Sequence, residues 1–194
     1  MHNYKENYNL DNKLAFVLGG SGLLGKEISL ALATYGAKVI ILDVKKDKIF
    51  FNKIGKINVD ISFFKIDLKQ IKNLEKNYKK IILKFGTPNI FVNSSYPKTK
   101  DWHKNNFKNI KLDSFSKNIE YQLITNSWIN YMTAKFMHKK NISGSIIQIG
   151  SIYGILAQDI NLYNKSKISE NLTYTAIKGG VTNFSKQLAS FYGK

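Results

Sequence analysis

The amino-acid sequence predicts an α/β fold in which a doubly wound parallel sheet, with helices on both faces, forms the middle of three layers. Two observations lead to this class. The chain contains several short apolar runs, and longer segments in which apolar residues recur every three or four positions separate these runs. This alternation favours parallel strands joined by helices. The length of 194 residues suggests one domain. We expect residues 13–194 to form it, after a polar lead-in over residues 1–12.

The expected elements alternate along the chain. The apolar runs predict strands over 14–18, 38–42, 61–66, 89–92 and 145–149. The periodic segments predict helices over 23–35, 69–85, 113–140 and 174–192. Gly36 and Gly86 follow the first two helices as stop signals, and Pro88 comes shortly after the second. Residues 150–173 are expected to form a loop.

A glycine-rich turn joins the first strand to the first helix. Gly19, Gly22 and Gly25 stand at every third position, and glycine permits a tight turn and a close approach of the backbone to a ligand. In Rossmann-type folds the pyrophosphate of a dinucleotide binds there, against the N-terminus of the helix. The spacing alone also fits a tight turn without a ligand. The turn is therefore a candidate nucleotide site that needs support from its surroundings.

An acid at the end of the second strand gives that support. A carboxylate at Asp43 can accept hydrogen bonds from the ribose hydroxyls of adenosine. It also repels a 2′-phosphate, so we expect NAD rather than NADP. Lys45 and Lys46 stand beside it and weaken the preference.

Composition argues against several other classes. The chain has no Cys, and His2, His103 and His138 show no ligand spacing, so no metal is expected. The net charge is +17, but all 30 basic residues are Lys, whereas proteins that read nucleic acids commonly use Arg. We expect no specific nucleic-acid partner. No apolar run reaches membrane-spanning length and no leader is visible, so we expect a cytoplasmic protein without membrane contact.

Two segments late in the chain supply candidate catalytic groups. Ser151 comes just after the fifth strand, and the carboxyl ends of parallel strands line the ligand crevice. Tyr174 and Lys178 are four residues apart and share one face of a helix. An ammonium near a phenol favours the phenolate, so such a tyrosine can pass a proton to or from a substrate oxygen.

The Tyr-x-x-x-Lys spacing is not specific in a chain so rich in lysine. It also occurs at Tyr96/Lys100, Tyr131/Lys135 and Tyr163/Lys167. Tyr174 differs from the others because small residues follow it, namely Ala176, Gly179 and Gly180. Small residues let a helix lie close to a sheet or a cofactor, which favours Tyr174 as the acid/base.

From Lys13 onward the chain resembles a short-chain dehydrogenase/reductase over essentially its whole length. The family's motifs occur in order: the glycine turn 19–25, Asp43, Asp67-Leu68, Asn93-Ser-Ser-Tyr96, Ser151 and Tyr174/Lys178. Segments 93–102 and 151–180 are similar to oxidoreductases of flagellin-modification and surface-sugar gene clusters. The resemblance implies an NAD(P)-dependent oxidoreductase that moves a hydride between nicotinamide and a hydroxyl or carbonyl carbon of a small molecule, such as a sugar.

The resemblance also implies roles for individual residues. Ser151 would orient the substrate oxygen, Tyr174 would be the acid/base, Lys178 would bind the nicotinamide ribose, and Gln122 would replace the family's catalytic asparagine. The cofactor contacts implied are Gly19, Ser21, Gly22, Leu24, Gly25, Asp43, Asp67, Leu68, Asn93, Tyr174 and Lys178. Family members pair between subunits through the helices that match 113–140 and 174–192, which implies a homodimer or homotetramer.

Departures from the family pattern leave alternatives open. Tyr96 replaces a glycine beside the cofactor. Ser151 and Tyr174 are further apart than usual, and Tyr163 fits the usual spacing better, so Tyr163 is the alternative base. Family members continue with further strands, so we expect the domain to lack its C-terminal strands. A non-catalytic dinucleotide-binding module and a sugar-nucleotide epimerase or dehydratase of the extended branch are the alternative functions.

Overall fold

The computed structural model describes residues 8–163 and 169–193 and has the predicted α/β architecture. Its parallel sheet contains β1 (Leu14–Leu18), β2 (Lys38–Asp43), β3 (Ile61–Lys65), β4 (Ile90–Asn93) and β5 (Ser145–Gln148). The strands pair in the order β3-β2-β1-β4-β5. The chain thus moves outward from β1 to β3 and returns on the other side of β1. In open α/β sheets, ligands bind outside the carboxyl ends of the strands at such a reversal.

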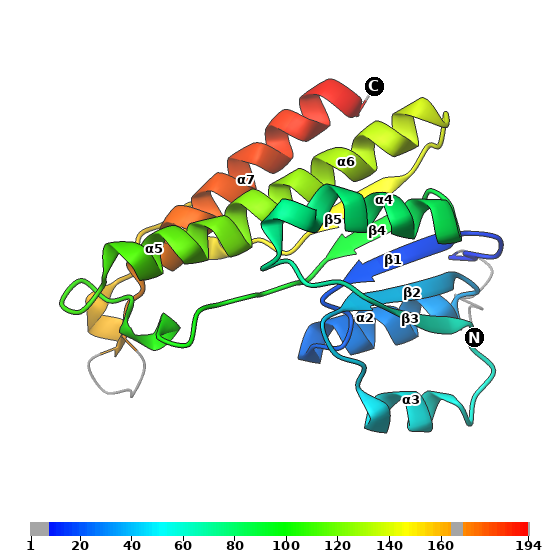
Figure 1. Cartoon of the computed structure of the whole chain (residues 1–194), viewed down its shortest axis with the longest axis horizontal. Coiled ribbons are helices and arrows are strands. Elements are labelled where there is room, and N and C mark those ends of the chain that lie inside the picture. The colour runs from blue at the N-terminus through cyan, green and yellow to red at the C-terminus, as the bar shows by residue number, and fades with distance from the viewer. Residues whose placement is uncertain (1–7, 164–168, 194) are drawn as a thin grey trace.

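One face of the sheet is covered by α2 (Leu23–Thr34) and α3 (Lys48–Ile54) (Figure 1). Side chains alternate between the two faces of a strand. Alternate strand residues therefore form one apolar cluster with the buried residues of these helices: Ala15, Val17, Val39, Ile41, Val92, Ala33, Phe50 and Ile54. Helix α3 was not predicted, because it is only seven residues long and shows too little periodicity. Its one local signal is Asp47, whose carboxylate caps the helix by accepting from the Phe50 N–H at 3.0 Å.

The opposite face is covered by α4 (Leu74–Phe85) and α6 (Thr125–Lys139), and α7 (Leu172–Tyr192) lies beside α6 (Figure 1). The other alternate strand residues pack against these helices, in a cluster that includes Phe16, Leu18, Ile40, Leu42, Phe91, Tyr78, Ile81 and Ile129. Helices on both faces of a parallel sheet confirm the predicted fold class.

The structure divides the predicted helix over 113–140. It begins as α5 (Leu112–Asn118), continues as a π-helical segment η3 (Ile119–Ile124) and ends as α6. Such π segments are rare and are often found at functional sites. The predicted helix over 69–85 starts later, with a 3-10 turn η1 (Ile71–Asn73) before α4, and the predicted loop 150–173 contains the 3-10 turns η4 (Ile152–Gly154) and η5 (Ile160–Tyr163).

The described part of the predicted lead-in is attached to the domain. The Leu10 N–H donates to the Tyr35 carbonyl at 2.8 Å, and the Leu10 side chain packs on the cluster beneath α2. Residues 1–7 lie outside the described part. Within residues 8–163 and 169–193, no helix is both long enough and apolar enough to cross a membrane.

Candidate functional site

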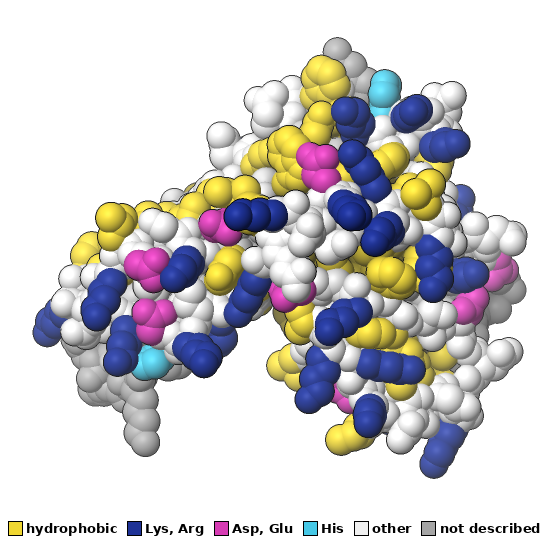
Figure 2. All heavy atoms as spheres, viewed as in Figure 1, with side chains coloured by type: hydrophobic (Ala, Val, Ile, Leu, Met, Phe, Trp, Pro, Cys, Tyr) yellow, Lys and Arg dark blue, Asp and Glu magenta, His cyan; other side chains and the backbone are white. Residues whose placement is uncertain are grey.

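A cleft of about 1340 Å³ lies at the carboxyl ends of the strands. Figure 2 shows the molecule hollowed there, between the part that holds α5 and the part that holds the sheet. The predicted cofactor residues that line the cleft are Gly19, Gly22, Leu24, Gly25, Asp43, Asp67, Leu68, Tyr174 and Lys178. Residues from both ends of the chain therefore meet in one cavity.

The glycine turn requires glycine at two positions. Gly19 has φ +78°, and a Cβ on it would lie 2.6 Å from the Ser95 Cα. A Cβ on Gly25 would overlap the carbonyl oxygen of Gly19. The turn is held by a 2.8 Å hydrogen bond from the Gly19 N–H to the Leu42 carbonyl. Its tight path is consistent with the role that glycine has in phosphate-binding turns.

Asp43 connects the end of β2 to this turn. Its Oδ2 accepts from the Ser21 N–H at 3.0 Å, and its Oδ1 accepts from the Val44 N–H at 2.7 Å. The carboxylate thus helps to shape the turn and lines the cleft as well. Asp67 lines the cleft at the next strand end, where its Oδ1 accepts from the Lys69 N–H at 2.9 Å.

Asn93 does not line the cleft but lies fully buried behind it. Its Oδ1 accepts from the Ser95 hydroxyl at 2.8 Å, and its Nδ2 donates to Asn130 Oδ1 at 3.2 Å. Asn130 Nδ2 in turn donates to Gln148 Oε1 at 2.5 Å. The Ser95 hydroxyl shares its one proton between Asn93 Oδ1 and Asn126 Oδ1, which lies 2.7 Å away. This buried network joins the ends of β4 and β5 to α6. Neither Asn126 nor Asn130 was predicted as a site residue, although their spacing of four places them on one face of a helix.

Tyr174 and Lys178 lie on the first turns of α7. Asn171 caps this helix, because its Oδ1 accepts from the Tyr174 N–H at 2.9 Å. The Lys178 side chain is 8% exposed, and its ammonium donates to the Ile149 carbonyl at 2.7 Å. The same ammonium lies 5.6 Å from the centre of the Tyr174 ring. Burial lowers the pKa of Lys178, because desolvation penalises the charged form.

The small residues after Tyr174 do permit a close approach. A Cβ on Gly180 would lie 2.8 Å from Leu123 Cδ2, and a Cβ on Gly154, in η4, would lie 2.6 Å from the Lys178 carbonyl oxygen. Helix α7 therefore packs tightly against η3 and η4.

Aromatic rings surround Tyr174 at this end of the cleft. Its ring centre lies 6.1 Å from that of Tyr96, 6.4 Å from that of Trp102 and 6.4 Å from that of Tyr153. All three pairs have the edge-to-face geometry that aromatic rings prefer. Trp102 and Tyr153 were not predicted as site residues, because nothing in their local sequence distinguishes them from other surface aromatics.

The alternative base Tyr163 also lines the cleft, but its hydroxyl donates to the Tyr153 hydroxyl at 3.1 Å. That hydrogen bond, together with burial, raises the pKa of Tyr163 to about 12. Its sequence partner Lys167 lies outside the described residues. Of the other pairs, Tyr131/Lys135 lies on α6 beside Trp128. Tyr96 lines the cleft, and burial raises its pKa.

Three further predicted site residues do not line the cleft as the structure has it. The Ser151 Oγ accepts from the Tyr153 N–H at 3.2 Å and caps η4. Gln122 lies in the π-helical segment and is 2% exposed. Within the described part of the chain, neither Gln122 Nε2 nor the buried Ser21 Oγ has a hydrogen-bond partner. Unpaired buried polar atoms are uncommon and are expected to bind water or a ligand.

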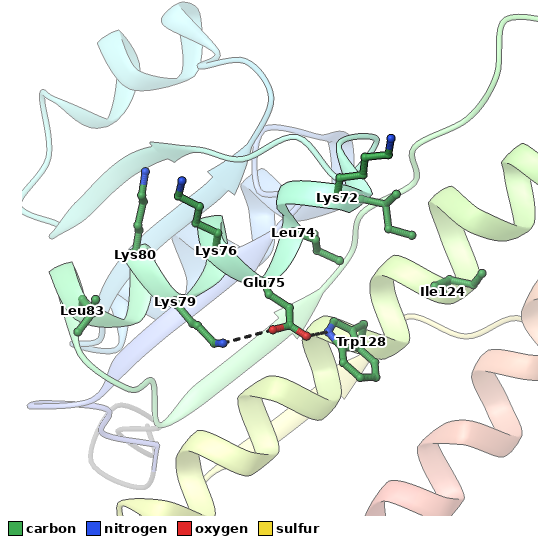
Figure 3. A pocket seen from close by; sticks show the side chains of 10 residues that line it. Lys72, Leu74, Glu75, Lys76, Lys79, Lys80, Leu83, Ile124 and Trp128 are labelled. Carbon is green, nitrogen blue, oxygen red and sulfur yellow. Dashed lines mark hydrogen bonds and ion pairs between the residues drawn. The ribbon is translucent and has the colours of Figure 1, made fainter.

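A second cavity, of about 800 Å³, lies on the surface between α4 and α6 (Figure 3). Its acid, Glu75, accepts from the Trp128 indole N–H at 3.0 Å and from the Lys79 ammonium at 3.2 Å. The hydrogen bond from Lys79 is the main cause of the lowered pKa of Glu75. Because each oxygen of the Glu75 carboxylate already accepts a hydrogen bond, this cavity is a weaker candidate for a catalytic site than the cleft.

Lysine side chains are spread over the face shown in Figure 2 rather than gathered in one patch. Among residues 8–163 and 169–193, no group of three or more His, Cys, Asp or Glu is arranged to hold a metal ion.

A glycine turn and an acid at the reversal point of an open parallel sheet define a dinucleotide-binding α/β fold. A family model of the short chain dehydrogenases matches residues 13–194. The chain therefore belongs to the short-chain dehydrogenase family of oxidoreductases, as its motifs predicted.

Individual relatives agree with this assignment. The chain is 25% identical over 183 residues to post-translational flagellin modification protein A of Campylobacter coli, covering 93% of this chain and 71% of that protein. It is 22% identical over 186 residues to a 7alpha-hydroxysteroid dehydrogenase of Bacteroides fragilis, covering 95% and 67%. The crystal structure of a short chain dehydrogenase from Leptospira borgpetersenii with bound NAD+ has the same fold, with a TM-score of 0.79, 22% identity and coverage of 98% and 69%. The resemblance to the flagellin-modification branch is thus confirmed.

Proposed function

We propose that this chain binds NAD in the cleft and transfers a hydride between its nicotinamide and a hydroxyl or carbonyl carbon of a small molecule. The observation that carries the proposal is that Tyr174 and Lys178 line the same cavity as the glycine turn and Asp43. A proton-transfer group and a dinucleotide-binding turn are the two parts that such a reaction needs.

The residues present fit the adenosine and pyrophosphate half of the cofactor. Gly22 is exposed and lines the cleft, so no side chain separates the turn from a phosphate. Asp43 lies at the end of β2, where a carboxylate can accept from ribose hydroxyls. Asp67 and Leu68 lie one strand further on and would contact the adenine ring. The carboxylate of Asp43 favours NAD over NADP, and the NAD+ in the Leptospira structure is in keeping with that preference.

When bound, NAD would supply the redox chemistry, as the donor or acceptor of the hydride. Tyr174 would hold and transfer the proton at the substrate oxygen. Lys178 would keep a positive charge near that phenol and reach the nicotinamide ribose, while its hydrogen bond to Ile149 fixes its position. Ser151 would donate its hydroxyl proton to the substrate oxygen, and its Oγ could keep accepting from the Tyr153 N–H, because a hydroxyl can donate and accept at once. The Gln122 Nε2, which has no hydrogen-bond partner among the described residues, would donate to a bound water.

Tyr174 is the better candidate base than Tyr163. The Tyr163 hydroxyl donates its proton to Tyr153, and its pKa of about 12 makes it a poor proton-transfer group near neutral pH. The Tyr174 ring lies close to the Lys178 ammonium.

A sugar or sugar derivative is the substrate class we propose, and the similarity to a flagellin modification protein supports it. The aromatic rings around Tyr174 suit the apolar C–H face of such a ring. We also propose that the enzyme works as a homodimer or homotetramer through α6 and α7.

A dinucleotide-binding module without turnover is the second candidate function. It is favoured by the position of Ser151, which does not line the cleft.

A titration with NADH, followed by an assay with a panel of sugar ketones, separates the two candidates. We expect NADH to bind, and Tyr174→Phe to lower turnover by about 10²- to 10⁴-fold with little change in NADH affinity. Tyr163→Phe is the matched control and should retain turnover within a few-fold. Equal activity of the Tyr174→Phe variant would refute the assignment of the base. Binding without turnover of any ketone would favour the second candidate, and absence of NADH binding would contradict both.

A further inference from the structure

The 3-10 turn η2 (Trp102–Lys104) and Asn105, which follows it, are tied to the start of α7 and its N-cap by three hydrogen bonds. Asn171 Nδ2 donates to the Trp102 carbonyl at 3.1 Å. The Leu172 N–H donates to the Asn105 carbonyl at 2.9 Å, and the Thr173 hydroxyl donates to Asn105 Oδ1 at 2.6 Å. These contacts join segments that are more than 65 residues apart in the sequence.

Asn105 is the buried centre of this connection. It is 1% exposed, and its Nδ2 donates to the Ser114 hydroxyl at 2.8 Å and to the Asp101 carbonyl at 3.2 Å. The side-chain oxygen of Asn105 thus bonds to α7, and its nitrogen bonds to α5 and to the residue that precedes η2. A buried amide with this many partners fixes its surroundings, because breaking any contact would leave a polar atom without a partner.

Asn171 performs two tasks with one amide group. Its oxygen caps α7 by accepting from the Tyr174 N–H, and its nitrogen holds the Trp102 carbonyl. The helix turn that carries Tyr174 and the loop turn that carries Trp102 are therefore fixed by the same side chain. The two rings meet edge to face, 6.4 Å apart, and both line the cleft.

We propose that Trp102 is a specificity-determining wall of the substrate site, and that Asn105 and Asn171 are the positioning residues that hold it beside Tyr174. This inference rests on the proposed function. Trp102 lies in the irregular connection between β4 and α5, and such connections are mobile unless they are anchored. A ring held at a fixed distance from the proton-transfer group selects substrates that present an apolar ring face next to the reacting carbon.

The substitution Asn171→Asp separates the two tasks of the amide. Aspartate is as good a helix cap as asparagine, so the cap on α7 is retained. The donor to the Trp102 carbonyl is lost, and a carboxylate faces that carbonyl oxygen instead. The variant should therefore release the Trp102 turn without unfolding α7. Asn73→Asp is the matched control, because Asn73 occupies the N-cap position of α4 and its side chain makes no capping bond there.

Tryptophan fluorescence reads the outcome without any ligand. The chain has two tryptophans, so in a Trp128→Phe background all tryptophan emission comes from Trp102. We expect Asn171→Asp to shift this emission to longer wavelength and to raise its quenching by acrylamide by about 1.5-fold or more, as local opening exposes the ring. Asn73→Asp should change neither. Unchanged emission and quenching in Asn171→Asp would overturn the positioning role.

A second variant keeps the test decisive if Asn171→Asp disturbs folding. Thr173→Val removes the hydroxyl that donates to Asn105 Oδ1 and keeps the shape of the side chain. It should change Trp102 emission in the same direction, and an unchanged signal would again overturn the proposal.

The functional consequence is measured on any ketone that the panel assay identifies. Loss of one anchoring hydrogen bond should raise KM by about three- to tenfold, with a smaller effect on kcat. A fall in kcat alone would contradict a specificity role for Trp102. Failure of NADH to bind would refute the proposed function, whereas the fluorescence result would still decide whether Asn171 positions Trp102.

Discussion

The Lys178 ammonium donates a 2.7 Å hydrogen bond to the Ile149 carbonyl and lies 5.6 Å from the centre of the Tyr174 ring. Ile149 follows β5 directly, so this bond ties α7 to the carboxyl end of the sheet. The charge is held in a nearly buried position, where it costs folding free energy.

The cost of burying Lys178 predicts a specific pH dependence of stability. The folded pKa of Lys178 is lowered by burial, so the unfolded lysine keeps its proton to higher pH than the folded one. Between the two pKa values the unfolded chain binds more protons, and the free energy of unfolding rises with pH. Lys178→Met removes this burial cost together with the donor to the Ile149 carbonyl, and its free energy of unfolding relative to that of the parent should be most favourable near pH 7. The difference should shrink as the pH approaches the ordinary lysine pKa of about 10.4.

Urea unfolding at several pH values checks this prediction. Lys186→Met, at an exposed lysine of the same helix, is the control. A difference between Lys178→Met and the parent that does not decrease toward high pH would contradict the expectation.

Gly25→Ala should destabilise the protein and weaken NADH binding. The new methyl group would overlap the Gly19 carbonyl oxygen, which is backbone and cannot rotate away. Overpacking of this kind costs about 1–3 kcal/mol. Gly55→Ala is the control, because Gly55 does not line the cleft and a Cβ there would lie no closer than 3.4 Å to its nearest neighbour. Urea unfolding and NADH titration measure both effects, and equal behaviour of the two variants would disprove the explanation.

Asp43→Asn should reduce the preference for NADH over NADPH. The parent carboxylate repels a 2′-phosphate, whereas an amide does not, and Lys45 and Lys46 then attract it. We expect the ratio of the two dissociation constants to change by about tenfold or more, a free-energy difference of about 1.4 kcal/mol. Asp60→Asn, at an exposed acid outside the cleft, should leave the ratio unchanged. If both variants keep the parent ratio, Asp43 does not select the cofactor.

Asn130→Ala should lower the free energy of unfolding, because Asn130 is 2% exposed and belongs to the buried hydrogen-bond network. The substitution removes the hydrogen-bond partners of Asn93 Nδ2, which is buried, and of Gln148 Oε1, which is partly buried. Leaving buried polar atoms unpaired costs about 1–3 kcal/mol. Ser127→Ala on the same helix is the control and should stay within about 0.5 kcal/mol of the parent. Equal unfolding midpoints for the two variants would show that the Asn130 hydrogen bonds do not contribute to stability.

The order of strands and helices, the glycine turn and the acid after β2 could all be predicted from the sequence. Each of these features is local, because apolar periodicity, glycine spacing and a charged residue at a strand end act over a few neighbouring residues. The same local patterns failed for α3, which is too short to show a period, and for η3, where the helical repeat changes within a continuous helix.

The candidate site depends on contacts between residues that are far apart in the sequence, and local patterns do not predict such contacts. Four Tyr-x-x-x-Lys pairs look alike in the sequence. Only packing places Tyr174 beside a buried Lys178 and lets the Tyr163 hydroxyl donate a hydrogen bond to the Tyr153 hydroxyl. Likewise, no local pattern connects Asn171 with Trp102, which are 69 positions apart. By itself the sequence therefore determined the fold and the glycine turn, because these follow from local periodicity and backbone freedom. Tertiary structure alone decided which side chains surround Tyr174, because burial and long-range hydrogen bonds exist only once the chain has folded.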